Sequence, residues 1–87
     1  MVRPNPCRHG AAVSITLATR EPVYSRVLEP SGRMVRDLAT GDILGAGVHE
    51  LRWDGRDSRG VAVRGGLYLV RTQAGHEVFV SKVAVVP

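Results

Sequence analysis

The segment 53–60 (WDGRDSRG) is the part of the sequence best suited to polar chemistry, because it places carboxylates among arginines and glycines. Asp54 and Asp57 suggest a calcium loop, but calcium loops place oxygen ligands at every second position. Here the two carboxylates are three residues apart, and Arg56 and Arg59 add positive charge where a cation would bind. The spacing instead predicts Asx-turns, in which each Asp accepts hydrogen bonds from amides of its own turn.

The same segment follows a strand pattern directly, which predicts a structural role for it. Residues 48–53 (VHELRW) alternate between two faces, and Trp53 ends the strand on the inward face. A large indole at that point is suited to closing one end of a small β core. Gly55 and Gly60 then supply backbone angles that other residues resist.

Histidine and cysteine do not combine into a predicted metal site. His9, His49 and His76 are far apart in the sequence, and Cys7 is the only cysteine. A Cys7-x-His9 pair falls short of the four ligands of a structural zinc site. His49 shares a strand face with Trp53, so we expect a histidine at the rim of the core with a backbone hydrogen bond.

No pattern of catalytic residues is evident. The glycine-rich stretches at 41–47 and 65–66 lack the Gly-Lys-Ser/Thr ending of a phosphate loop. The serines lack a Gly-x-Ser-x-Gly context, and a catalytic histidine would need a nucleophile or carboxylate partner. We therefore predict a protein that is not an enzyme and that uses no cofactor.

The chain of 87 residues is basic, with 12 Lys and Arg against 8 Asp and Glu, but the charge is dispersed. The densest group, Arg52 to Arg64, alternates with acidic residues. We weighed a nucleic-acid surface against a solvated face with local ion pairs, and the lack of an aromatic platform beside the arginines favours the solvated face. No apolar run approaches the ~20 residues of a membrane span, and residues 1–10 lack the apolar core of a signal peptide. Export would need a signal upstream on a longer parent.

The pattern of apolar residues predicts a single all-β domain. We expect a linker at 1–10 that leads into a domain at 11–87. The expected strands cover 12–18, 22–28, 34–38, 48–53, 67–73 and 77–86, with a short extended segment at 61–63.

The turns and faces between these strands are also predictable. Glu29-Pro30-Ser31-Gly32 has the composition of a type I turn and joins two strands as a hairpin. Residues 39–47 hold three glycines and predict a loop, with Ile43 and Leu44 as plugs on the core. Ser25 falls on the inward face of its strand.

Several of these residues resemble the immunoglobulin-like domain first described in the flagellar hook-capping protein FlgD. The resemblance extends over about 13–73 and is most specific from Ala46 to Tyr68. The motif residues are Gly32, Arg33, Gly47, His49, Trp53, Asp54, Gly55, Asp57, Gly60, Gly66 and Tyr68. The resemblance implies an immunoglobulin-like β-sandwich of about seven strands. At Ser25 the family usually has an aliphatic residue, which predicts either a weaker strand or a shifted face here.

Pro4-Asn5-Pro6 and the last strand, through Lys82, are similar to a subset of this family that ends large secreted bacterial proteins, as in type IX secretion. The resemblance implies a C-terminal accessory module, outside the cell or on its surface, whose partners are proteins: export or anchoring machinery, or neighbouring domains. Strand 77–86 with Lys82 is the expected recognition element. A passive spacer, a hook-capping scaffold and a carbohydrate-binding module remain alternatives. Neither nucleic-acid binding nor membrane insertion is expected.

Overall fold

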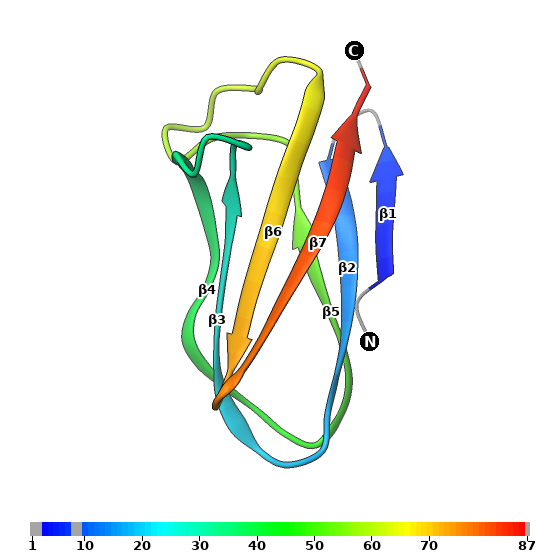
Figure 1. Ribbon diagram of the computed structural model, residues 1–87, viewed down its shortest axis with the longest axis vertical. Coiled ribbons are helices and arrows are strands. Elements are labelled where there is room, and N and C mark those ends of the chain that lie inside the picture. The colour runs from blue at the N-terminus through cyan, green and yellow to red at the C-terminus, as the bar shows by residue number, and fades with distance from the viewer. Residues whose placement is uncertain (1–2, 8–9, 87) are drawn as a thin grey trace.

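The computed structural model describes residues 3–7 and 10–86, and these form strands and turns without a helix. Seven strands follow one another along the chain (Figure 1). They are β1 (Arg3–Cys7), β2 (Gly10–Leu17), β3 (Glu21–Leu28), β4 (Met34–Leu44), β5 (Gly47–Trp53), β6 (Gly66–Ala74) and β7 (Glu77–Val85). Within the described ranges no helix is long and apolar enough to cross a membrane.

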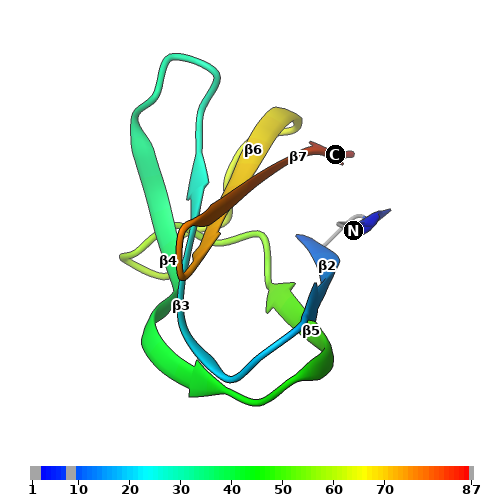
Figure 2. The same cartoon turned by 60° about the horizontal axis from the view of Figure 1, so that its bottom comes forward.

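The strands form two antiparallel sheets, in the orders β1-β2-β5 and β4-β3-β6-β7. Figure 2 shows the sheets facing one another, and the chain crosses between them after β2, after β4 and after β5. β4 pairs with β3, whereas the fourth strand of a constant-type immunoglobulin domain pairs with the fifth. The predicted immunoglobulin-like β-sandwich of about seven strands is confirmed.

The core consists mainly of β-branched side chains that alternate with exposed ones along each strand. Ile15 of β2 is fully buried, and Val23 and Val27 of β3 reach it from the opposite sheet. Val70 and Val83 complete the centre of this cluster. The period-2 pattern of the sequence therefore identifies the buried faces correctly, because one face of each sheet must be removed from water.

The loop predicted at 39–47 is wrong over most of its length, because β4 continues to Leu44. Three shifts of register between β3 and β4 absorb residues that do not fit a regular ladder. Gly41 has φ +91° within the strand, and a Cβ there would lie 3.1 Å from the Tyr24 hydroxyl, so the tyrosine ring covers the glycine. Leu44 packs on the core as expected, but Ile43 is 55% exposed and is not a plug.

The linker predicted at 1–10 contains strand β1. Residues 3–7 pair with 10–14 of β2 in an antiparallel register. β1 is an edge strand, and edge strands accept proline because one side of their ladder needs no donors. Pro4 and Pro6 therefore gave a misleading sequence signal.

Ser25 has a polar partner that compensates for its place in the core. Its hydroxyl lies 2.9 Å from the hydroxyl of Thr72 on β6, and both residues are buried. The two residues are direct cross-strand neighbours. A hydrogen bond between two buried hydroxyls satisfies both groups, so the inward Ser25 does not leave an unpaired polar atom.

Candidate functional site

The segment after β5 folds as a small hairpin. The Asp57 N–H donates to the Val61 carbonyl and the Gly60 N–H donates to the Asp57 carbonyl, both at 2.9 Å. The Val63 N–H donates to the Gly55 carbonyl, also at 2.9 Å. Gly55 and Gly60 have φ of 77° and 82°, where side chains introduce strain, so the predicted backbone role of these glycines is confirmed.

The two aspartates of this hairpin act as predicted Asx acceptors. Asp54 Oδ1 accepts the Arg56 N–H at 3.1 Å, and Asp57 Oδ1 accepts the N–H groups of Arg59 at 2.9 Å and Val61 at 3.0 Å. The Val61 N–H is the main cause that lowers the pKa of Asp57, and the charges of Arg59 and Arg33 act in the same direction.

This lowered pKa makes the stability of the domain depend on pH. Because the folded state holds the Asp57 proton more weakly than the unfolded state, Asp57 stabilises the fold above the ordinary Asp pKa of ~3.9. That stabilisation is lost as the pH falls through the lower folded pKa. In thermal melts between neutral and strongly acidic pH, the advantage of the wild type over Asp57→Asn should therefore shrink at acidic pH. A constant difference between the two proteins would contradict this role.

The β3–β4 turn has the same backbone hydrogen bonds as the turn at Asp57. The Gly32 N–H donates to the Glu29 carbonyl at 2.8 Å, and the Glu29 N–H donates to the Arg33 carbonyl at 2.9 Å. Gly32 also has positive φ, at 94°. The predicted turn at 29–32 is confirmed, and its pattern of an acidic residue followed three positions later by glycine recurs at Asp57 and Gly60.

Two contacts hold the hairpin that follows β5 against strand β4. The Ser58 N–H donates to the Val35 carbonyl at 3.0 Å. Arg36 forms a 2.8 Å ion pair with Asp54. These contacts place the two turns side by side, although they are far apart in the sequence.

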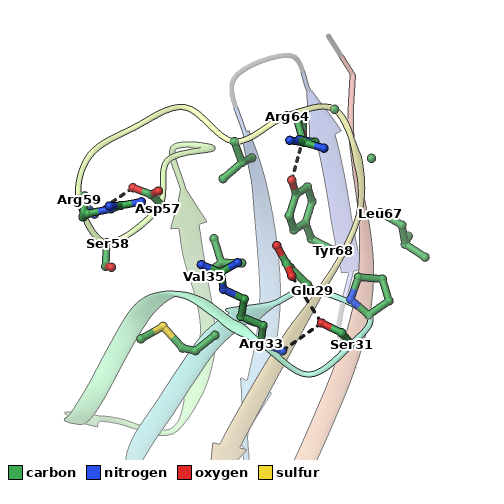
Figure 3. Close-up of a pocket in the computed structure, with 15 residues that line it drawn as sticks. Glu29, Ser31, Arg33, Val35, Asp57, Ser58, Arg59, Arg64, Leu67 and Tyr68 are labelled. Carbon is green, nitrogen blue, oxygen red and sulfur yellow. Dashed lines mark hydrogen bonds between the residues drawn. The ribbon is translucent and has the colours of Figure 1, made fainter.

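A groove of about 810 Å³ lies between the two turns and the start of β6 (Figure 3). Glu29 and Arg33 line one side, and Asp57 and Arg59 line the other. Tyr68 forms the inner wall, from which its hydroxyl donates to the Arg64 carbonyl at 2.7 Å. Burial raises the pKa of this hydroxyl, so Tyr68 remains a neutral donor at physiological pH.

The Trp53 side chain packs against Tyr68, the residue that forms the inner wall of the groove. Its ring and the Tyr68 ring meet edge to face, with centroids 5.3 Å apart. Its indole N–H donates to the Arg56 carbonyl at 2.9 Å. Trp53 is buried at the end of the core, as the sequence predicted, and its indole also connects the core to the hairpin.

The predicted motif residues do not all gather at this groove. Gly47 lies at the other end of β5, about 20 Å from Trp53 at the rise of a strand, and His49 lies about 13 Å from it. The His49 Nε2–H donates to the Gly45 carbonyl at 2.6 Å, which is the predicted backbone hydrogen bond. Gly66, with φ 153°, starts β6 beside the groove.

Sequence reasoning missed part of the groove. Glu29, Ser58 and Arg64 line it without having been predicted as site residues. The recurring turn pattern could have identified Glu29 and Ser58. Two turns with the same backbone hydrogen bonds place their side chains at equivalent positions. Cys7-x-His9 falls partly outside the described residues. Among the residues that the structure describes, no group of three metal-ligating side chains occurs.

Lys82 lies elsewhere, on the outer face of the four-stranded sheet. On this face of β7 it stands between Val80, which is 59% exposed, and Ala84. In the register of β6 and β7, Leu69 is opposite Lys82, and Arg71 is opposite Val80. The outer face of β7 is therefore apolar with one lysine, which is unusual for the solvent side of an antiparallel sheet.

The edge of β7 that does not pair with β6 is covered. β7 pairs with β6 on one side, and on its other side it contacts β1 of the opposite sheet (Figure 1). Strand addition at this edge would require β1 to move. The outer face of β7 is accessible without such a rearrangement.

The fold resembles segments of two large proteins from Porphyromonas gingivalis. Dimeric latent PorU matches with a TM-score of 0.73 and 24% identity over 99% of this chain. PorZ, described as an essential bacterial surface component of the type IX secretion system, matches with a TM-score of 0.64 and 18% identity over 100% of this chain. The chain spans only 9% of PorU and 11% of PorZ.

FlgD from P. aeruginosa matches with a TM-score of 0.60 and 23% identity, over 82% of this chain and 57% of FlgD. No protein-family model matches the sequence, and no curated protein matches it significantly. The predicted resemblance is thus confirmed at the level of the fold. In its fold, this chain is similar to FlgD and to segments of PorU and PorZ.

Proposed function

We propose that this chain is a non-catalytic accessory domain of a larger exported bacterial protein, and that a protein of the export or surface-anchoring machinery binds it. The observation that carries the proposal is the match of the whole chain to segments of about a tenth of PorU and PorZ. In those two proteins the matching segment is a small part of a long chain, which supports a longer parent for this domain as well. PorZ is described as a surface component of a secretion system, which supports an extracellular or cell-surface location for the parent.

The outer face of the four-stranded sheet is the surface best suited to a protein partner. Val78 and Val80 of β7 are exposed there, and Tyr24 of β3 is exposed on the same face. Clustered exposed apolar side chains mark interaction sites on soluble proteins. Lys82 and Arg71 place positive charge within this apolar surface, which favours a partner with acidic groups.

The test is surface display of a reporter. The complete chain would be fused to the C-terminus of a fluorescent protein with an export signal and expressed in P. gingivalis. We expect surface fluorescence that depends on the fusion and that falls with Lys82→Glu. Arg52→Glu, on the outer face of β5, is the matched control and should leave display unchanged. Equal display of the Lys82→Glu fusion, with an unchanged melting temperature, would leave only a passive spacer.

The alternatives have less support. The FlgD match favours a hook-capping scaffold, but it covers less of this chain than the PorU and PorZ matches do. A carbohydrate-binding face needs several exposed aromatic side chains. Among residues 11–86, Tyr24 is the one large aromatic that is mostly exposed, at 53%.

A further inference from the structure

The groove between the two turns is lined by more arginines than acidic residues. Three arginines line it: Arg33, Arg59 and Arg64. In the part of the chain that the structure describes, the ion pairs are Arg26–Asp37, Arg36–Asp54 and Arg52–Glu50. None of the three groove arginines belongs to these pairs, and all three are exposed. Their guanidinium groups are therefore available to a ligand.

The acidic residues of the groove are engaged by its own turns. Asp57 Oδ1 accepts two backbone N–H groups, and Glu29 Oε1 accepts the Ser31 hydroxyl at 3.4 Å. Each carboxylate is thus committed to stabilising the turn on which it lies. The three guanidinium groups set the recognition chemistry of the groove, since an Arg fork binds carboxylates in a bidentate manner.

Apolar side chains border the same groove. Met34 is 42% exposed and Leu67 is 47% exposed, and both line it together with Pro30 and Val63. A simple inorganic anion or a polyanion would be bound by cations alone. Exposed apolar groups beside arginines suit a ligand that carries both carboxylates and apolar side chains, because each kind of group then has a partner.

The walls of the groove are fixed before any ligand binds. Each turn is closed by its own pair of backbone hydrogen bonds, and the Tyr68 hydroxyl holds the Arg64 carbonyl. A groove of about 810 Å³ is within the size range of pockets that bind ligands and can hold a few residues of a peptide. Preformed walls reduce the entropy lost on binding.

We propose that this groove binds an acidic peptide segment in which carboxylate side chains alternate with apolar ones, with Arg33, Arg59 and Arg64 as the carboxylate-binding residues. The site lies apart from Lys82 and β7, so the proposal goes beyond the accessory role and does not depend on it.

The test is binding of a synthetic peptide that alternates glutamate with leucine, measured by fluorescence anisotropy with the 87-residue chain. We expect saturable binding that weakens as salt is added, because exposed charges are screened. The same peptide with glutamine in place of glutamate should bind much more weakly. Equal binding of the two peptides would overturn the proposal, and so would tighter binding of inorganic phosphate or heparin than of the acidic peptide.

Single substitutions of the groove arginines test whether the peptide binds in the groove. Each of Arg33→Gln, Arg59→Gln and Arg64→Gln should weaken binding roughly two- to five-fold, which is the effect of one exposed ion pair. Arg52→Gln, outside the groove, should change nothing. All four residues are exposed, so the variants should keep the wild-type melting temperature. Wild-type affinity in the triple groove variant, or an equal loss in Arg52→Gln, would show that the peptide binds elsewhere.

Discussion

Replacing Trp53 by alanine should lower the free energy of unfolding by about 3–5 kcal/mol, as truncation of a buried Trp does. Trp53 is 3% exposed, so nearly the whole indole is removed from the core. The substitution also removes the ring contact with Tyr68 and the donor to the Arg56 carbonyl. Since small domains have a total stability of roughly 5–15 kcal/mol, this loss should be visible as a much lower urea midpoint.

Trp53→Phe is the matched control. Phenylalanine keeps an aromatic edge near Tyr68 but has no donor for the Arg56 carbonyl. It should therefore destabilise the domain less than alanine does. If Trp53→Ala shifted the urea midpoint no more than an exposed substitution such as Val48→Ala does, the burial of the indole described above would be contradicted.

Removing one member of the Ser25–Thr72 pair should cost about 1–3 kcal/mol, because the other hydroxyl is left buried without its partner. Thr72→Val keeps the side-chain shape, and Ser25→Ala removes a single oxygen. The double variant should be less destabilised than the sum of the two single variants predicts. Urea unfolding of the four proteins gives the interaction energy directly.

The interaction energy from this cycle distinguishes a hydrogen-bonded pair from two side chains that only pack in the core. Two hydroxyls that do not interact would give additive losses, which would contradict the hydrogen bond. A coupled pair explains how Ser25 is tolerated in an apolar core. The sequence comparison predicted a weaker strand at Ser25 because it could not see Thr72, which lies 47 residues away.

Most of the strands were predictable because a half-buried strand must alternate. Val13, Ile15 and Leu17 have this pattern, and all three are buried. β4 was predicted too short because Gly41 is a turn signal in a sequence, whereas in the fold the bulged ladder and the Tyr24 ring accommodate it. β1 was missed because proline argues against a strand unless that strand is known to lie at an edge.

The site was predictable where the interactions are local. Asp54 and Asp57 bond to amides within four residues, so their spacing alone identified them as turn acceptors. The groove was not predictable, because it depends on the Ser58–Val35 contact between segments that are distant in the sequence. The role of Lys82 stays a prediction, since recognition depends on a partner.

The two equal turns that frame the groove have a consequence for how such a domain can diversify. In each turn the acidic residue and the glycine set the backbone, whereas the two central residues make none of the backbone hydrogen bonds that close it. The side chains at the central positions can therefore vary while the backbone of each turn is kept, as when a loop is grafted onto a scaffold. These positions are Pro30-Ser31 and Ser58-Arg59. Substitutions at these positions that keep the Ser58 N–H, which donates to the Val35 carbonyl, should alter which ligand the groove accepts while the sandwich beneath stays the same.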